Sequence, residues 1–517
     1  MGKTCLLGVD VGTYSSKGVL VDLDGNVLAS HVVPHQIEIP KPGFVEHDPE
    51  KVWWNDFVVI VRNLMKATDV QPKNIIGIGT SGIGPCVLPV DKDGKPLRKA
   101  ILYGVDTRAG DEIDYLEEVL GEKKILSLAG SKLTSQAAGP KVLWIRRNEP
   151  EVYSKARWFL TSQSYIIYKL TGKPAIDIYS AAGYAPLFDV FNRKWVDEME
   201  MIVSTKMLPE AFWSHEIVGR VTSTAASETG LSEGTPVVAG TTDAAAEAIS
   251  AGVSQIGDMM LMLGSSVFFI VRTPKIIMSE NFWSSNFMQE NTFAALGGMS
   301  TGGSLITWFR DQFGQIELEM EKNGKGNAFE ELSKLASNSP KGARGIIVLP
   351  YFAGERTPIN DPEAKGIFFG LTLQHTRGDL IRAILESIAY GIRHNFEVMT
   401  QEGIQPRRVI LAGGGLKNPL LTQLIADICT SKLNIPNQQI GASYGDAFLA
   451  AIGVGVFKNI EAINNWIEIQ GAIEPDLSFS DIYEIKYRLF RELYSQTKAL
   501  MHDVHNLQVR LSDQQLS

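Results

Sequence analysis

The chain has 517 residues, 44% of them hydrophobic, and a formal net charge of −9. Because this length exceeds what one hydrophobic core holds, we expect two large domains, and the acidic balance argues against a nucleic-acid partner. Three widely spaced cysteines, no signal-peptide pattern and no apolar stretch long enough to cross a bilayer predict a cytoplasmic protein without a membrane partner.

The first predicted elements are a strand, a tight turn and a second strand near the N-terminus. An apolar run ends at Asp10, a turn rich in glycine and hydroxyl residues follows, and a second apolar run returns. Backbone N–H groups of such a turn can wrap phosphate oxygens with the hydroxyls of Thr13, Ser15 and Ser16, and Lys17 adds positive charge. Asp10 would repel phosphate, so its natural companion is a hydrated Mg²⁺. An ordinary hairpin with a polar tip is the alternative.

The rest of the first half alternates strands and helices. The pattern predicts a helix at 52–65, a strand at 75–79, a hairpin at 87–90 and mostly helical structure at 109–170. A buried strand at 236–240 closes this half. Such alternation is typical of an α/β protein.

A carboxylate follows that last strand. Asp243 stands at its C-terminal end, where α/β proteins bind ligands, and alanines after it start a helix. With Asp10 serving the metal, Asp243 could take the proton of a substrate hydroxyl. The alternative is that Asp243 only caps the helix at 244–251.

The second half opens with a pattern similar to the first. Residues 258–271 read as a strand, a small hydroxyl-bearing turn and another strand, a weak internal repeat. Two phosphate-gripping hairpins, one per domain, would face each other across a cleft that closes around a nucleotide and a second substrate. We also expect a surface loop at 321–327 and a C-terminal packing helix at 483–511, which leaves a homodimer contact open.

Two later segments suit a nucleotide site and a hinge. A strand at 409–412 runs into three glycines, which let a flat adenine ring approach the backbone, and Asn418 could hydrogen-bond that ring. A generic tight turn is the alternative. Small residues between 442 and 453 permit close helix packing, either at a domain hinge or in any tight core.

One motif points to a different class of enzyme. Residues 298–302 match the nucleophile elbow of serine hydrolases, with Ser300 as nucleophile and His375 or His394 as base. The same turn also suits the wall of a nucleotide site. A serine hydrolase therefore remains an alternative function.

Together the motifs resemble the FGGY family of carbohydrate kinases, which shares the nucleotide-binding fold of actin, hexokinase and Hsp70. The most specific match joins residues 366–371 to residues 379–386 and fits the second family signature at every defined position. Residues 46–49 and 355–362 make the chain most similar to the xylulokinase group. The likeness covers nearly the whole chain.

This resemblance implies an α/β fold of two RNase H-like domains with an inter-domain active-site cleft. The expected N-terminal domain, 1–246, carries the sugar side and the first phosphate loop. The expected C-terminal domain, 247–517, carries the nucleotide side and the last helix. ATP and Mg²⁺ are the implied cofactors, and a small sugar is the implied partner.

The resemblance also implies roles for single residues. Asp243 corresponds to the general base, and Asp10 to the residue that holds Mg²⁺ through water. The implied ATP-binding residues are Gly12, Thr13, Ser15, Lys17, Gly264, Ser265, Gly303, Thr307, Gly414 and Asn418. The implied sugar-binding residues are Ser81, Gly82, Asp106, Arg108, Gln136 and Asp243.

The sugar-binding positions depart from the xylulokinase pattern. Residues 81–85 read Ser-Gly-Ile-Gly-Pro where many xylulokinases have Gln-Met-His-Gly, and a missing histidine donor changes which hydroxyls are read. The expected reaction is ATP-dependent phosphorylation of D-xylulose to D-xylulose 5-phosphate. The alternatives are a kinase for another ketopentose, gluconate or a tetritol, and a non-catalytic nucleotide-binding regulator of the same fold.

Overall fold

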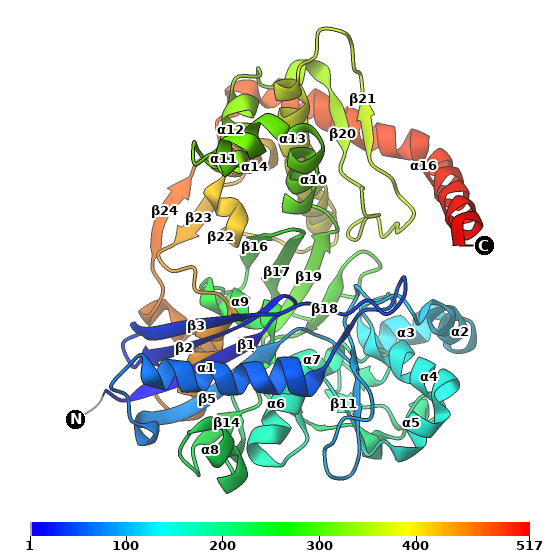
Figure 1. Cartoon of the computed structure of the whole chain (residues 1–517). Coiled ribbons are helices and arrows are strands. Elements are labelled where there is room, and N and C mark those ends of the chain that lie inside the picture. The colour runs from blue at the N-terminus through cyan, green and yellow to red at the C-terminus, as the bar shows by residue number, and fades with distance from the viewer. Residues whose placement is uncertain (1–2, 517) are drawn as a thin grey trace. The chain divides into compact units, whose positions relative to one another are not determined.

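The computed structural model describes residues 3–516 and contains two compact units. Unit 1 extends to Ile256 and also takes in Arg272–Ala295 and Gln438–Glu468. Unit 2 consists of Gly257–Val271, Leu296–Asn437 and the residues from Ile469 onward. The units therefore interleave along the chain, as the colours of Figure 1 show. The predicted functional division at residue 246 stays a prediction.

A mixed sheet forms the centre of unit 1 (Figure 1). In order of pairing its strands are β13 (Ile217–Arg220), β14 (Pro236–Val238), β5 (Ile75–Gly82), β1 (Cys5–Val11), β2 (Ser15–Asp22) and β3 (Val27–Pro34), with β15 (Thr241–Thr242) also beside β5. β1 is antiparallel to β2 and parallel to β5. The predicted strand, turn and strand at the N-terminus are thus confirmed.

Helices α1 (Asn55–Lys66) and α15 (Ala442–Gly453) are prominent among those that pack on this sheet. α1 contacts β2 and β3, and α15 contacts β1 and β5. A Cβ added at Gly8 would overlap the carbonyl oxygen of Ser443, and one at Gly79 would overlap that of Asp446. Because these two positions are glycines, α15 rests on the strand backbone itself. The close packing predicted for residues 442–453 is confirmed.

The remaining elements of unit 1 are short. A π-helical turn at Pro49–Trp54 precedes α1, so the regular helix begins three residues later than predicted. The other helices are α2 (Gly110–Leu120), α3 (Glu122–Ala129), α4 (Ala138–Asn148), α5 (Pro150–Lys155), α6 (Ser162–Thr171), α7 (Ile178–Ala182), α8 (Ser223–Thr229) and α9 (Asp243–Ser250). The minor strands are β4 (Glu46–His47), β6 (Leu88–Val90), β7 (Ala100–Ile101), β8 (Trp158–Leu160), β9 (Ala175–Asp177), β10 (Phe188–Asp189), β11 (Lys194–Trp195), β12 (Glu210–Phe212) and β18 (Trp283–Asn286).

Unit 2 repeats the central arrangement of unit 1. Its successive paired strands are β19 (Phe293–Met299), β17 (Val267–Thr273), β16 (Asp258–Leu263), β22 (Arg408–Ala412), β23 (Leu433–Pro436) and β24 (Ile469–Ile473). β16 is antiparallel to β17 and parallel to β22, as β1 is to β2 and β5. The predicted internal repeat is therefore present as topology.

Helices of unit 2 complete the fold. They are α10 (Gly303–Phe313), α11 (Gln315–Lys322), α12 (Ala328–Ser337), α13 (Arg377–Gln401), α14 (Pro419–Cys429) and α16 (Ser480–Leu516), and a short hairpin pairs β20 (Ile347–Leu349) with β21 (Ile367–Phe369). α16 includes the predicted C-terminal helix. Within residues 3–516, none of the helices has the length and apolar character needed to span a bilayer.

Candidate active site

Adjacent parallel strands of unit 1 bring the predicted catalytic residues together. Asp10 on β1 pairs with Ser81 on β5, and Ser81 pairs in turn with Thr241 on β15. Asp243 begins α9 directly after β15. Asp10, Ser81 and Asp243 therefore lie at the carboxyl ends of neighbouring strands, the edge at which α/β proteins bind ligands.

Asp243 is the first residue of α9 rather than its N-cap. The N-cap residue of α9 is Thr242, and Asp243 Oδ1 accepts a hydrogen bond from the N–H of Ala244 at 2.7 Å. Burial raises the pKa of Asp243 to about 7, the Ala244 hydrogen bond opposes this rise, and the charge of Glu247 adds to it. A carboxylate with such a pKa exchanges protons near neutral pH.

Carboxylates outnumber cations at this edge of the sheet. Burial raises the pKa of Asp10 well above its ordinary value, and the charges of Asp243 and Glu247 raise it further. A hydrogen bond from Ser81 and the charge of Lys17 act in the opposite direction. Carboxylate oxygens that carry excess negative charge suit a hydrated divalent cation, because the cation relieves their repulsion. The donor set at Asp10 therefore fits Mg²⁺.

Asp446 joins this group from α15 and was missed by the sequence analysis as a site residue. The hydroxyl oxygen of Ser81 lies 2.7 Å from Asp446 Oδ2 and 3.0 Å from Asp10 Oδ1. Asp446 is fully buried, and burial together with the charge of Asp10 raises its pKa. An acidic residue inside an otherwise apolar, small-residue helix was the signal that could have identified it.

The β1–β2 turn divides its predicted phosphate-binding hydroxyls between two faces. Side chains alternate along a strand, so Ser15 and Lys17 share one face of β2 and Ser16 lies on the other. Ser16 is buried and donates to Asp56 Oδ2 at 2.8 Å, so the prediction that its hydroxyl faces phosphate is wrong. Lys17 Nζ donates to the carbonyl oxygen of Ile440.

The turn itself is closed by its own backbone. The N–H of Gly12 donates to the carbonyl oxygen of Ser15 at 3.0 Å, and a Cβ at Gly12 would press against that same oxygen. The hydroxyl of Thr13 lies 3.1 Å from that of Tyr103. Glycine is therefore required at position 12 for the turn, and its role toward phosphate stays a prediction.

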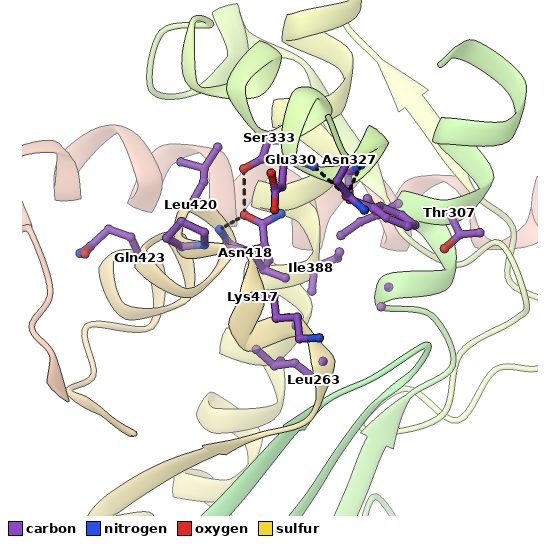
Figure 2. Close-up of a pocket in the computed structure, with 18 of the residues that line it drawn as sticks. Leu263, Thr307, Asn327, Glu330, Ser333, Ile388, Lys417, Asn418, Leu420 and Gln423 are labelled. Atoms are coloured by element: carbon purple, nitrogen blue, oxygen red, sulfur yellow. Dashed lines mark hydrogen bonds between the residues drawn. The ribbon is translucent and has the colours of Figure 1, made fainter. Parts of the chain in front are cut away.

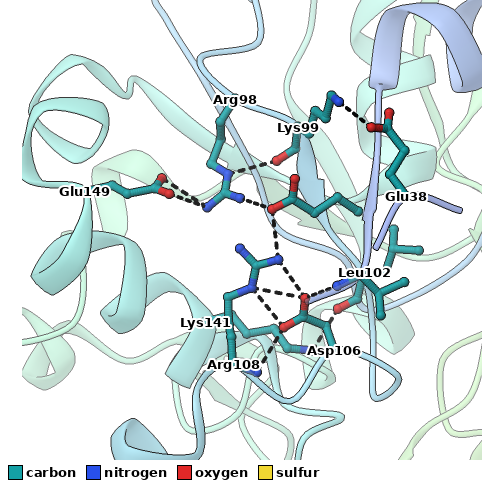
Figure 3. Close-up of polar contacts among 10 residues, drawn as sticks. Glu38, Arg98, Lys99, Leu102, Asp106, Arg108, Lys141 and Glu149 are labelled. Carbon is teal, nitrogen blue, oxygen red and sulfur yellow. Dashed lines mark hydrogen bonds and ion pairs between the residues drawn. The ribbon is translucent and has the colours of Figure 1, made fainter. Parts of the chain in front are cut away.

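Asp106 and Arg108, two predicted sugar-binding residues, form a buried ion pair (Figure 3). Arg108 Nη2 lies 2.7 Å from Asp106 Oδ2 and 2.9 Å from Glu46 Oε1, and both partners of the ion pair have fully buried side chains. The guanidinium also lies over the rings of Phe44 and Trp144. These contacts fix the loop that carries both residues. Their contact with a sugar stays a prediction.

A buried lysine joins the same loop to the segment that carries Gln136, another predicted sugar-binding residue. Lys141 Nζ donates three hydrogen bonds of 2.8 Å to the carbonyl oxygens of Leu102, Tyr103 and Ser135. Gln136 Oε1 accepts the N–H of Gly104 at 3.3 Å. Burial lowers the pKa of Lys141 to about 8. All three ammonium donors have acceptors, so Lys141 positions both predicted sugar-binding segments.

The predicted ATP-binding residues of the second half line a single pocket of unit 2 (Figure 2). They are Gly264, Ser265, Gly303, Thr307, Gly414 and Asn418. The pocket volume of about 1270 Å³ exceeds the roughly 300–1,000 Å³ usual for small-molecule sites. Residues at the start of α12, among them Asn327 and Phe329, also line it and were not predicted.

Asn418 is held in this pocket by two hydrogen bonds to its amide oxygen (Figure 2). Asn418 is the N-cap of α14. Its Oδ1 accepts a hydrogen bond from the N–H of Leu421 at 3.1 Å and another from the hydroxyl of Ser333 on α12 at 3.1 Å. Both bonds use the oxygen, so the amide NH₂ is the group that Asn418 can offer a ligand. A ring nitrogen acceptor of adenine would match it.

The second predicted phosphate loop is tied to the start of α10. The N–H groups of Gly303 and Ser304 donate to the carbonyl oxygens of Gly264 and Ser265 at 2.8 and 2.9 Å. These bonds satisfy amides that a helix N-terminus otherwise leaves unpaired. The loop and the helix therefore form one rigid wall of the pocket.

Ser300 belongs to the same wall rather than to a catalytic triad. Its N–H donates to Glu355 Oε1 at 2.7 Å, and its hydroxyl also hydrogen-bonds that carboxylate. His375 is half-buried and hydrogen-bonds Thr372 and the backbone of Arg344. The partner of Ser300 is therefore the buried carboxylate of Glu355, and His375 is bonded elsewhere, which argues against the hydrolase alternative.

Comparison with known proteins establishes the family. The model of the N-terminal domain of the FGGY family of carbohydrate kinases matches residues 5–250, and that of the C-terminal domain matches residues 259–454. The chain therefore belongs to the FGGY family of carbohydrate kinases. It is a sugar kinase, and the predicted two-domain α/β fold is confirmed.

Individual relatives are similar to this chain over nearly their full length. The chain is 33% identical over 508 residues to a xylulose kinase of Staphylococcus epidermidis, covering 98% of this chain and 99% of the relative. It is 30% identical over 507 residues to a xylulose kinase of Escherichia coli, covering 96% and 99%. The crystal structure of xylulose kinase from Rhodospirillum rubrum has a TM-score of 0.88 and 30% identity, covering 96% of this chain and all of that one.

Proposed function

We propose that this kinase transfers the γ-phosphoryl group of Mg-ATP to a hydroxyl of D-xylulose and forms D-xylulose 5-phosphate. The observation that supports this most strongly is the register that places Asp10, Ser81 and Asp243 side by side at the strand ends. The xylulose kinases of Staphylococcus epidermidis and Escherichia coli, which match over almost the whole chain, support the choice of sugar.

Asp243 acts as the general base in this proposal. Its carboxylate accepts the proton of the attacking hydroxyl as the new oxygen–phosphorus bond forms. A pKa of about 7 suits this role, because about half of the carboxyl groups are ionised at neutral pH and the carboxylate is basic enough to hold a proton. Its place at the N-terminus of α9 stabilises the ionised form.

Asp10 would hold Mg²⁺ through water, and Lys17 and the turn hydroxyls of Thr13 and Ser15 would bind phosphate oxygens. When bound, the ion neutralises charge on the phosphates of the donor. Lys17 supplies fixed positive charge beside Asp10, its direct partner across the β1–β2 ladder. Catalysis in this arrangement is mainly positioning and electrostatic stabilisation.

The pocket of unit 2 would hold the nucleotide. Gly414 lets the adenine ring lie against the backbone, and the amide NH₂ of Asn418 donates to the ring. Gly264 and Ser265, bonded to the start of α10, would contact the phosphates. The pocket volume of about 1270 Å³ leaves room for a nucleoside triphosphate with ordered water.

The acceptor specificity is set by unit 1 in this proposal. Ser81, Gly82 and Gln136 would contact sugar hydroxyls, and no histidine stands in the segment after β5. Other ketopentoses, gluconate and tetritols are therefore the competing acceptors.

A coupled ADP-release assay across pentuloses, hexuloses, aldonates and polyols tests the proposal. D-xylulose should give the highest kcat/KM. A higher value for another acceptor would replace the sugar but keep the chemistry. ATP binding without ADP release for any acceptor would instead support a non-catalytic regulator of this fold.

A further inference from the structure

We propose that Asp446 is a positioning residue that orients Asp10 through the hydroxyl of Ser81. In this hydrogen-bond chain of three residues, Asp446 is the neutral donor at the buried end. This inference rests on the proposed function, since it concerns the carboxylate that would hold Mg²⁺. Neither the FGGY family match nor the predicted site residues assign Asp446 a role.

The contact between α15 and the sheet fixes Asp446 in place. Its backbone carbonyl rests where a Cβ of residue 79 would lie, and Gly445 makes an equally close approach to the carbonyl of Ala246 on α9. The helix cannot slide or rotate at this point without a clash with backbone atoms. The side chain of Asp446 is therefore presented to Ser81 by a rigid support on two sides.

The number of available hydrogens determines the direction of the hydrogen bonds between Asp446, Ser81 and Asp10. The hydroxyl of Ser81 has one hydrogen, yet carboxyl oxygens lie on two sides of it, 2.7 Å away at Asp446 and 3.0 Å away at Asp10. Both contacts are hydrogen bonds only if a carboxyl group supplies the second hydrogen. Two ionised carboxylates on one hydroxyl would leave one contact repulsive.

The surroundings assign that hydrogen to Asp446. Asp10 is the direct partner of Lys17 across the ladder and would face the cation, so a negative charge is better compensated at Asp10 than at Asp446. Asp446 is fully buried, and no described residue donates to its Oδ1. An unpaired carbonyl oxygen of a neutral acid costs far less to bury than an unpaired carboxylate oxygen. The bonds then run from Asp446 Oδ2–H to Ser81 Oγ, and from Ser81 Oγ–H to Asp10 Oδ1.

These two hydrogen bonds fix the orientation of Asp10 and leave lone pairs of its carboxylate available to the hydrated cation. Removal of a residue that hydrogen-bonds a metal ligand, without touching the metal itself, commonly lowers metal affinity by about 10–100-fold. Loss of Asp446 should therefore weaken metal binding. A neutral side chain at position 446 that can still donate a hydrogen bond to Ser81 should preserve the metal affinity.

The test compares D446A, D446N and the matched control S443A by Mn²⁺ binding in the presence of ADP, followed by electron paramagnetic resonance. D446A should bind Mn²⁺ about 10-fold more weakly, with a parallel rise in the Mg²⁺ concentration for half-maximal rate. D446N should retain most of the wild-type affinity, because its amide N–H can donate to Ser81. S443A, on the same helix, should match wild type, because no described residue hydrogen-bonds that buried hydroxyl.

Two results would overturn the inference: equal Mn²⁺ affinity in D446A and wild type, or a loss in D446N as large as in D446A. Should D446A fail to fold by thermal melting, S81A breaks the same chain from its other side. Adding D446N to S81A should then change affinity no further, and an additive loss would overturn the inference. Absence of sugar-dependent ADP release in the wild-type enzyme would overturn the proposed function instead.

Discussion

Asp10 and Lys17 are directly paired residues of the β1–β2 hairpin, so the carboxylate proposed for the metal and the lysine proposed for phosphate share one face of the sheet. The lysine ammonium also donates to the carbonyl oxygen of Ile440, just before α15. A positive charge is thereby fixed beside a cluster of carboxylates. Its placement follows from strand register and not from a flexible side chain.

Replacement of this lysine tests its proposed role toward phosphate. Lys17→Met should lower kcat by roughly 100-fold, as loss of a preorganised electrostatic contact typically does. Lys3→Met, which removes an exposed lysine just before β1, should leave kcat unchanged. Steady-state ADP release at saturating ATP and sugar measures both. Equal rates for the two variants would remove Lys17 from the phosphate site.

Asp243→Asn separates catalysis from folding. The amide keeps the size of the side chain but cannot accept a proton, so sugar-dependent ADP release should fall by about 10²–10⁴-fold. The melting temperature and the affinity for ADP should stay near wild type, since Asp243 is not the N-cap of α9. A variant that retains most of its turnover would exclude Asp243 as the base.

The acidic limb of the pH profile follows from the same residue. Burial raises the pKa of Asp243 to about 7, so below that pH the carboxyl is increasingly protonated and cannot take the hydroxyl proton. kcat/KM for the sugar should therefore fall about tenfold per unit below about pH 7 and level off above it. Initial rates between about pH 5.5 and 8.5 test this. A profile that is flat down to the acid end would place the base elsewhere.

Local pattern was enough to predict the two hairpins and the strand that delivers Asp243, because each depends on residues adjacent in sequence. Asp446 could not be found this way, since its bond to Ser81 joins positions 365 residues apart. The misassigned hydroxyl of Ser16 is different. Alternation along β2 already separates Ser16 from Lys17, so strict use of the two-residue period would have predicted its burial.

The sugar-loop residues show a further limit of sequence patterns. The acidic Asp106 and the basic Arg108 were predicted to face a sugar, yet their fully buried side chains also pair with each other, and Arg108 pairs with Glu46 as well. Motif identity alone cannot distinguish a side chain that contacts substrate from one that shapes the loop behind it. That distinction depends on burial, which arises from long-range packing.

Lys141 offers a test of how firmly that loop must be held. Lys141→Met removes three hydrogen bonds and leaves their carbonyl acceptors without a donor, which should lower stability by roughly 1–3 kcal/mol. The KM for sugar should rise more than the KM for ATP, because the loosened segments lie in unit 1. Lys155→Met, at an exposed position, is the control. An equal rise in both KM values would indicate general destabilisation instead.

Ser333 provides the corresponding test for the nucleotide pocket. Its hydroxyl donates to the amide oxygen of Asn418 at 3.1 Å, and this bond helps to hold the amide NH₂ toward the ligand. Ser333→Ala should raise the KM for ATP about 2–10-fold, which corresponds to the roughly 0.5–1.5 kcal/mol of one neutral hydrogen bond. kcat should stay near wild type, because the contact is far from the reacting atoms in the proposed binding mode.

Ser337, one turn further along α12, supplies the matched control for this measurement. Its hydroxyl donates to the backbone carbonyl of Ser333 at 2.9 Å and not to Asn418. Ser337→Ala therefore removes a hydroxyl from the same helix without freeing the asparagine, and the KM for ATP should not change. If both variants raise this KM equally, the effect comes from α12 as a whole, and the adenine contact assigned to Asn418 loses its support.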